Sequence, residues 1–169
     1  WQGWSPSSPP ARRQSYLLKK MTRLPMLAGS ALHEALEEWI QAREQGAQLT
    51  EEQVLKTALA NFRGGYKESR AGKWKQSTSK FTHLAEHHYE ESCIDEASGA
   101  AANYGKRYVE RLTEGVSFFF HAPELADVRA AEPKDFLACE ELGSFDYDGT
   151  KLYAVPDFAF RRPDGAVMI

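Results

Sequence analysis

The spacing of apolar residues changes near Gly115, and this change constrains the fold more than any other feature of the sequence. Before Gly115, apolar residues recur at three- and four-residue intervals, which is typical of amphipathic helices. After it, short apolar and aromatic runs alternate with turn signals, which is typical of antiparallel strands. The sequence therefore predicts one α+β domain over 1–169, mostly helical over 1–115 and strand-rich over 116–169.

Capping and breaking residues divide the helical part. Ser8 is a candidate N-cap before Pro9, Pro25 is expected to break the first helix, and Thr50 with Gln53 forms a capping-box pattern. Gly64-Gly65 is expected to end the third helix, with a basic loop after it over 65–79. The predicted helices span about 9–23, 29–46, 50–63, 80–93 and 98–114.

Turn signals organise the strand-rich part. Asp148-Gly149 and Asp164-Gly165 are two-residue hairpin signals, because both central positions of such a turn favour positive φ. The predicted strands span 116–120, 136–147, 151–160 and 166–169, and the last three form an antiparallel meander.

The net charge of −3 conceals two basic stretches. Residues 1–33 hold five Lys and Arg and no acid, and residues 63–80 hold six Lys and Arg against one acid, Glu68. Such stretches suit a polyanion such as nucleic acid, although an ordinary solvated surface is the common alternative. The candidate phosphate-binding residues are Arg12, Arg13, Lys19, Lys20, Lys73 and Lys75.

Other classes of protein are disfavoured by composition. No apolar run is long enough for a membrane helix, and no signal-peptide pattern stands at the start, so we expect no membrane partner. Two cysteines, Cys93 and Cys139, are too few for a disulfide framework or a four-cysteine metal cluster. So few cysteines suit a reducing compartment, so we expect a cytoplasmic localisation.

Asp157 stands inside the apolar segment 153–160, where we expect a strand. A carboxylate buried there is costly unless it is paired, hydrogen-bonded or bound to a metal, whereas an aspartate facing solvent on an edge strand needs no such explanation. His33 lies beside the apolar stripe of the predicted second helix, and by itself it is better explained as a core histidine. The two become informative in combination.

Gly29 followed by His33 on a helix, and Pro156-Asp157 on the second strand of a meander, resemble the PD-(D/E)XK nuclease superfamily. The similarity is to its RecB-like branch, which includes CRISPR-associated and repair exonucleases, and it covers about 60 residues, 8–36 and 136–169. An acid also lies on the preceding strand, where this chain has Glu140 and Glu141.

This resemblance implies a restriction-endonuclease-like core, built from a helix and a three-stranded antiparallel meander after an N-terminal helical region. It implies Mg²⁺- or Mn²⁺-dependent hydrolysis of DNA, single- or double-stranded, by an exonuclease of repair, recombination or defence, with a helicase or repair protein as a partner. His33 and Asp157 would bind the metal, and Glu140, chosen over Glu141, would support catalysis.

The family's acid-any-lysine motif is expected after Ile169, so we expect the domain to be incomplete at its C-terminus and inactive alone. The internal match Glu132-Pro133-Lys134 precedes Asp157, which contradicts the family order, and it fits a surface loop. The alternative from another class is a catalytically inactive nucleic-acid-binding module with the same fold.

A third hypothesis comes from His83, Glu86 and His87. Two histidines four residues apart on one helical face, with a glutamate beside the second, match the inverted zinc-protease pattern. In that interpretation the histidines bind zinc and Glu86 is the general base. A polar helix face is the simpler alternative.

Overall fold

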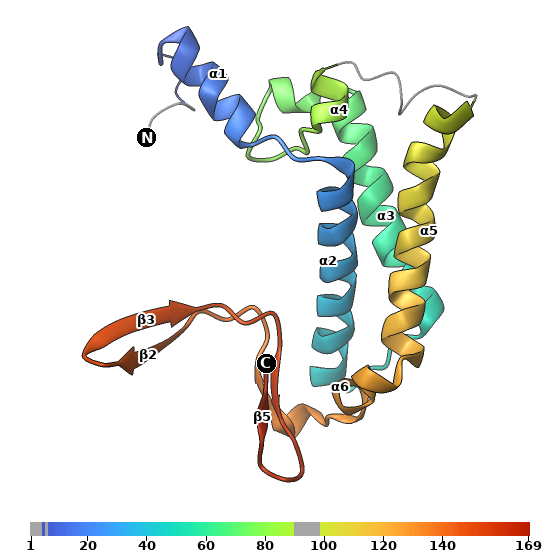
Figure 1. Ribbon diagram of the computed structural model, residues 1–169, viewed down its shortest axis with the longest axis vertical. Helices are drawn as coiled ribbons and strands as arrows, with labels where there is room; N and C mark the ends of the chain where they lie inside the picture. The colour runs from blue at the N-terminus through green and yellow to red at the C-terminus, as the bar shows by residue number, and fades with distance from the viewer. Residues whose placement is uncertain (1–4, 6, 90–98) are drawn as a thin grey trace.

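Figure 1 shows the computed structural model, which describes residue 5 and residues 7–89 and 99–169. Helices and small antiparallel sheets are both present, so the α+β class is confirmed. The helices are α1 (Pro10–Lys19), α2 (Leu24–Glu44), α3 (Glu51–Arg70), α4 (Ala85–His88), α5 (Gly99–His121) and α6 (Ala126–Ala130). Single 3₁₀ turns are η1 (Lys73–Lys75), η3 (Pro123–Leu125) and η4 (Pro133–Asp135). The strands are β1 (Phe136–Ala138), β2 (Gly143–Tyr147), β3 (Thr150–Ala154), β4 (Ala159–Arg161) and β5 (Val167–Met168).

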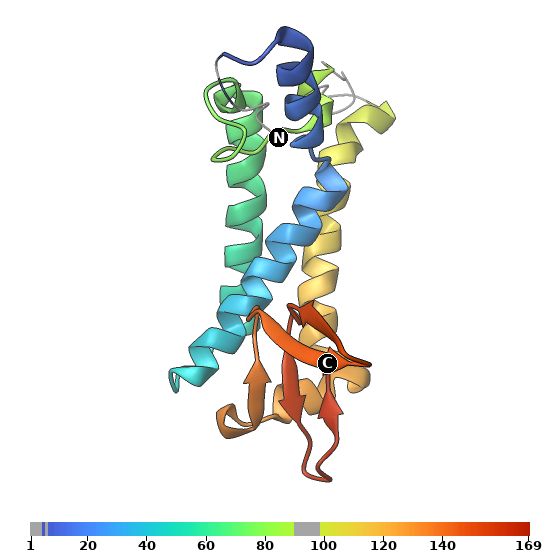
Figure 2. The ribbon, with the colours of Figure 1, turned by 90° about the vertical axis from the view of Figure 1, so that its left-hand side faces the viewer.

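The hydrophobic core lies among three long helices. In the view of Figure 2, α2 crosses in front of α3 and α5, and the sheets lie at its C-terminal end. The ring of Trp39 meets that of Phe119 edge to face at 5.0 Å, which joins α2 to α5. Apolar side chains at helical spacing fill the interior: Leu24, Ala28, Ala31, Ala35, Ile40, Val54, Ala58, Phe62, Leu112 and Val116.

Proline begins α2 instead of ending the helix before it. Pro25 occupies the first turn of α2, where its missing N–H costs nothing, so this helix starts at Leu24 and not at Gly29. Helix α1 ends at Lys19, earlier than predicted, and its N-cap residue is Pro9 without a side-chain hydrogen bond, so the predicted serine cap is wrong. Gly29 lies inside α2.

Helix α3 confirms its predicted start and extends beyond its predicted end. Thr50 accepts the backbone N–H of Gln53 at 3.3 Å, and the Gln53 side chain accepts the backbone N–H of Thr50 at 2.8 Å. Gly64 and Gly65 do not stop the helix, which continues to Arg70. A methyl group at Gly65 would lie only 2.8 Å from Cδ1 of Leu27, so close packing against α2 explains this glycine.

The two glycines give a matched pair of stability predictions. We expect Gly65→Ala to lower the free energy of unfolding by about 1–3 kcal/mol, because the added methyl overpacks the contact with Leu27. We expect Gly64→Ala to raise it by about 0.5–1 kcal/mol, because no atom lies within 4 Å of that methyl and alanine favours the helix. Urea unfolding of both variants measures the difference, and equal effects would contradict the packing explanation.

Two further predicted elements are corrected. Residues 116–120 are not a strand but the end of α5, because Val116 and Phe119 are spaced to face the core from one helix side. The predicted helix over 80–93 is reduced to the single turn α4, while 90–93, with Cys93, lies outside the described residues.

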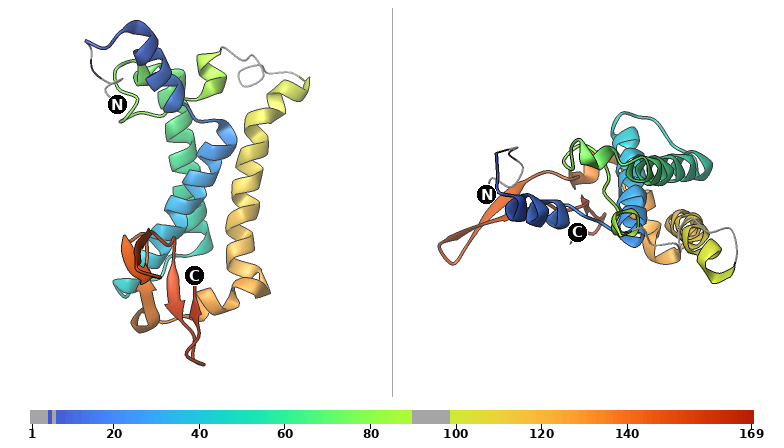
Figure 3. Two further views of the ribbon diagram at one scale, coloured as in Figure 1. Left: turned by 60° about the vertical axis from the view of Figure 1, so that its left-hand side comes forward. Right: turned by 90° about the horizontal axis from the view of Figure 1, so that it is seen from above.

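The predicted meander is formed, but each of its long strands is interrupted. Strands β1, β4 and β5 make one antiparallel sheet in the order β1-β4-β5, and β2 pairs with β3 in a separate hairpin. The predicted strand 136–147 thus becomes β1 and β2, and the predicted strand 151–160 becomes β3 and β4. As seen in Figure 3, the β2–β3 hairpin and α1 extend to the same side of the long helices.

The two turns differ in backbone conformation. Asp148 and Gly149 have φ values of 47° and 73°, as the prediction requires for a two-residue hairpin. The second turn is not the predicted two-residue hairpin turn: only Gly165 has a positive φ, 86°, and three residues separate Arg162 from Ala166, whose carbonyl accepts the N–H of Arg162 at 2.8 Å. In the described residues, no helix has both the length and the apolarity that crossing a membrane requires.

Candidate metal centre

Three side chains from separate segments meet beside α2. Nε2 of His33 lies 2.5 Å from Oε1 of Glu140, and Nδ1 of His33 lies 4.0 Å from Oδ2 of Asp157. Within 7–89 and 99–169, no other group of three or more His, Cys, Asp or Glu residues brings its ligand atoms within 4.8 Å of one another. The structure therefore brings together the three residues that the sequence nominates for metal binding and catalysis.

The interruption of the strands positions the two carboxylates. Glu140 follows β1 with a φ of 55°, a conformation that disrupts a regular strand. Its backbone N–H donates to the carbonyl of Pro156 at 3.1 Å, which ties the gap between β1 and β2 to the gap between β3 and β4. Glu140 and Asp157 therefore stand on opposite sides of one break in a strand pair.

Asp157 is not inside a strand, contrary to prediction. It lies in the bend between β3 and β4, and its side chain is 83% exposed. Water therefore solvates the carboxylate, which needs no buried partner. The side chains of His33 and Glu140 are 42% and 33% exposed. The group is thus open to solvent on the Asp157 side, where a ligand can approach.

A cavity of about 420 Å³ adjoins His33 and Asp157. Its wall includes Glu37, which follows His33 by one helical turn and accepts a hydrogen bond from Gln41 at 2.8 Å. Sequence analysis missed Glu37, although a carboxylate four residues after a candidate ligand on a helix is a recognisable signal. The remaining wall is largely apolar, with residues such as Leu36, Ile40, Phe119, Phe158, Phe160 and Met168.

Several carboxylates surround the Cys139 thiol, and they affect its pKa. Partial burial, together with the smaller effect of the carboxylates of Glu37, Glu44, Glu140 and Glu141, raises the pKa of Cys139 to about 11. Cys139 is therefore a neutral thiol at pH 7 and does not add a thiolate ligand to the group. The ligands available beside it are nitrogen and oxygen.

The three residues fit a divalent cation by the chemistry of their donors. Two carboxylates are the ligands that Mg²⁺ and Mn²⁺ prefer, and an imidazole favours Mn²⁺ over Mg²⁺. In the structure the His33–Glu140 contact is direct, so these two groups satisfy one another where a cation would otherwise bridge them. Binding of a cation would replace the hydrogen bond between His33 and Glu140 with one bond from each residue to the cation.

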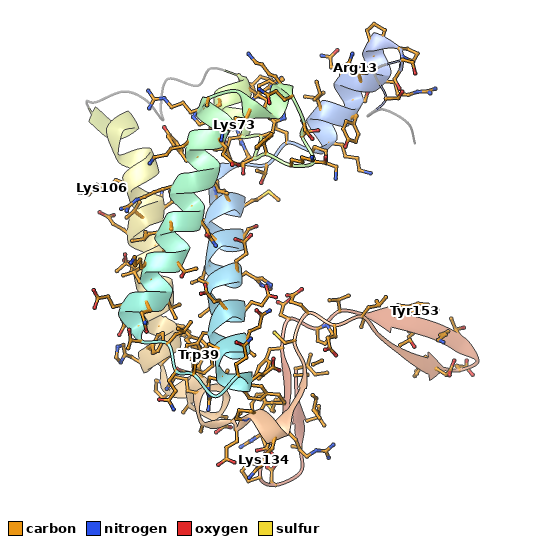
Figure 4. All side chains as sticks on the ribbon, turned by 180° about the vertical axis from the view of Figure 1, so that it is seen from behind. Arg13, Trp39, Lys73, Lys106, Lys134 and Tyr153 are labelled. Carbon is orange, nitrogen blue, oxygen red and sulfur yellow. The ribbon has the colours of Figure 1, made fainter. Side chains whose placement is uncertain are left out.

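The predicted phosphate-binding residues gather at the opposite end of α2. Four of them, Arg12, Arg13, Lys19 and Lys20, lie on α1 or directly after it, and Lys73 and Lys75 lie on η1. Figure 4 shows Arg13 and Lys73 at the same end of the molecule. They differ in their contacts, because Lys73 lies 3.9 Å from Glu68 whereas Arg13 and Lys75 line one small cavity.

The zinc-protease pattern does not form a helical pair. His83 precedes α4, so it does not share a helical face with His87. Nε2 of His83 lies 3.0 Å from Nδ1 of His88, and Nδ1 of His87 lies 2.9 Å from Oγ of Ser69. Burial lowers the pKa of His83 to about 4, and the neighbouring His88 contributes in the same direction, so His83 is neutral at pH 7.

Glu86 has a structural contact that explains its burial. Its side chain is fully buried, and Oε1 accepts the backbone N–H of Leu24, the first residue of α2, at 3.1 Å. A carboxylate there satisfies a free N–H and interacts favourably with the positive end of the helix dipole. Glu86 therefore caps α2 from a distant part of the chain.

No family model, curated protein or solved structure matches the chain. The residues that the fold brings together therefore carry the information about function. In the part of the chain that the structure describes, these are the group of His33, Glu140 and Asp157, and the basic residues of α1 and η1.

Proposed function

We propose that the protein is a metal-dependent nuclease of the PD-(D/E)XK type that hydrolyses phosphodiester bonds of DNA, acting as an exonuclease in repair, recombination or defence. The observation that carries the proposal is the convergence of His33, Glu140 and Asp157. His33 and Glu140 are separated by 107 residues, and only the tertiary fold brings them together. The donor set is the one that the sequence resemblance implies.

Each residue of the group has a distinct part in the proposal. The imidazole of His33 and the carboxylates of Glu140 and Asp157 hold a Mn²⁺ or Mg²⁺ ion. The bound cation supplies Lewis-acid chemistry, polarising the phosphate and lowering the pKa of the attacking water. Because Asp157 is the most exposed of the three, its side of the group is where a phosphodiester approaches.

Gly29 supports this assignment. It lies one turn before His33 on α2, and no atom lies within 4 Å of the position that a side-chain methyl would occupy. Packing therefore does not require a glycine at this position, although glycine inside a helix costs about 1 kcal/mol relative to alanine. A bare helix surface beside the metal ligands lets the backbone of a substrate strand come close to His33.

The basic residues of α1 and η1 supply the affinity for DNA in this proposal. Lys and Arg contacts to phosphates give binding that is independent of sequence and weakens with salt. Figure 1 shows that α1 projects to the side of α2 on which the sheets lie, and the sheets carry Glu140 and Asp157. A strand bound along α1 can therefore continue toward the metal ligands.

A metal titration tests the proposed centre directly. We expect the protein to bind one Mn²⁺ per chain by calorimetry, and Glu140→Gln to weaken that affinity at least about tenfold, about 1.4 kcal/mol, because a carboxylate ligand is lost. Glu141→Gln is the matched control, expected to stay within about threefold. Absence of stoichiometric Mn²⁺ binding, or equal weakening in both variants, would indicate that His33 and Glu140 form only a surface ion pair. Either result would favour the inactive DNA-binding module.

A further inference from the structure

A second cavity lies between α1 and the segment that contains η1. Its volume is about 200 Å³, and it is formed by two parts of the chain that are distant in sequence. The residues around it are Arg13, Tyr16, Leu17, Trp74, Lys75, Gln76, Ser77, Thr78 and Ser79. The cavity is large enough for a phosphate group and its immediate substituents, and it shares no residue with the cavity beside His33.

The chemistry of this cavity suits an anion. Two of its side chains are cations and none is a carboxylate, while hydroxyl groups are contributed by Tyr16, Ser77, Thr78 and Ser79. Within the described part of the chain, neither Arg13 nor Lys75 forms an ion pair, whereas the neighbouring Lys73 lies 3.9 Å from Glu68. Hydrogen-bond donors and positive charge therefore converge without an internal acceptor of opposite charge.

Both walls of the cavity are held by one short segment. The N–H of Thr22, just after α1, donates to the His83 carbonyl at 2.9 Å, and the N–H of Ala85 donates to the Thr22 carbonyl at 2.8 Å. On the other wall, the ring of Trp74 stacks on His83 with centroids 3.8 Å apart. Residues 83–85 thus contact both the segment that follows α1 and the ring of Trp74, and so connect the two walls of the cavity.

The charge around the cavity indicates what kind of anion it receives. Helix α1 contains no acidic residue, and Arg12, Lys19 and Lys20 extend its positive charge beyond the cavity itself. A small anion would interact mainly with the cavity, whereas a strand with successive phosphates would also interact with these cations. This favours a polyanion with one phosphate held in the cavity.

We propose that the cavity of Arg13 and Lys75 is a phosphate-binding site that anchors one phosphate of a nucleic-acid strand. It is separate from the metal centre. Its residues on one wall, Arg13, Tyr16 and Leu17, precede Leu24, where α2 begins, and Leu24 is nine residues before His33, about 14 Å along the helix. The site acts by binding alone and requires no metal. It therefore stands whether or not the chain cleaves DNA.

The test uses the indole N–H signal of Trp74 in NMR spectra, assigned with Trp74→Phe, during titration with a short single-stranded oligonucleotide without metal. We expect a saturable shift. The double variant Arg13→Gln/Lys75→Gln should lose at least about tenfold in affinity, and its salt slope should fall by about 1.4, the value for two phosphate contacts to a single strand. The indole shift should be lost in the same variant.

Two charge-matched variants make the test specific. Arg12→Gln/Lys73→Gln removes the same charge from the surrounding basic residues, so it should lower oligonucleotide affinity less than Arg13→Gln/Lys75→Gln does and should keep the Trp74 shift. Lys106→Gln/Arg107→Gln, on exposed α5 positions distant from α1, should bind like the unmodified protein. Equal losses in the first two variants would overturn the proposal, because they would indicate diffuse attraction without a defined site.

A titration with inorganic phosphate separates the two sources of the ligand. A Trp74 shift with inorganic phosphate but none with the oligonucleotide would overturn the assignment to a strand. Mn²⁺ affinity is measured in the same Arg13→Gln/Lys75→Gln variant and should be unchanged, because His33, Glu140 and Asp157 are intact. Failure of the phosphate site and failure of the metal centre therefore give different results.

Discussion

Asp157→Ala is expected to lower Mn²⁺-dependent cleavage of DNA at least about 100-fold in kcat/KM, while DNA binding stays within about threefold. The physical reason is that the variant removes one of the two carboxylates beside His33, whereas the basic residues of α1 and η1 are untouched. The assay uses the complete protein, because the resemblance implies that a further acid-any-lysine motif takes part in cleavage. Product release from a labelled duplex and from a labelled single strand, with and without EDTA, measures the effect.

Asp164→Ala is the matched control for this experiment. Asp164 lies in the turn before β5 and accepts the backbone N–H of Ala166 at 3.0 Å, so its loss affects one turn. Cleavage by this variant should stay within about threefold of the unmodified protein. Cleavage that survives Asp157→Ala would contradict the assigned centre, and an unmodified protein that binds DNA but never cleaves it would favour the inactive binding module.

Glu86→Ala is expected to lower the free energy of unfolding by about 2–3 kcal/mol and the Tm by about 5–10 °C. The side chain is fully buried, and its carboxylate accepts the backbone N–H of Leu24. Without it, the N-terminus of a 21-residue core helix loses its cap and a cavity remains. Thermal unfolding followed by circular dichroism gives the measurement.

Two variants calibrate this result. Glu86→Gln keeps an oxygen acceptor for Leu24 and loses only the charge, so about 1 kcal/mol is expected. Glu38→Ala removes an exposed glutamate from α2, the helix that Glu86 caps, and should change the free energy of unfolding by no more than about 0.5 kcal/mol. A Glu86→Ala protein as stable as the Glu38→Ala protein would show that the cap contributes nothing.

The Glu86→Ala variant also distinguishes a structural role of Glu86 from the zinc-protease hypothesis. A general base acts on chemistry and can be removed with little change in stability, whereas a buried cap acts on folding. Because α4 begins at Ala85, His83 does not present the helical spacing on which that hypothesis depends. A large loss of stability in Glu86→Ala therefore supports the cap.

Two local signals in the sequence predicted local structure correctly. The capping box of Thr50 and Gln53 and the positive φ values of Asp148 and Gly149 formed as expected, because each depends on residues within three positions of one another. Pro25 and Gly65 were misjudged as helix breakers. Their roles depend on position within a helix and on the neighbouring Leu27, which the local sequence does not specify.

The site was nominated from sequence, but its composition was not fully determined there. His33, Asp157 and Glu140, chosen over Glu141, were nominated through the resemblance, whereas the physical basis for the position of Glu140 is a backbone φ of 55° that interrupts the strand. Alternation along an unbroken strand would have placed adjacent glutamates on opposite faces without showing which face meets α2. Glu37 joined the site only through the cavity that it lines with His33 and Asp157.

The sequence by itself determined the α+β class, the apolar faces of the long helices, the hairpin turn and the clustering of positive charge near the N-terminus, since all of these depend on residue type and short-range spacing. Only the tertiary structure decided that Glu140 reaches His33, that Glu86 caps α2 and that Arg13 shares a cavity with Lys75. These contacts join segments far apart in the chain. Their formation depends on how the helices pack and where the strands break, which no local pattern specifies.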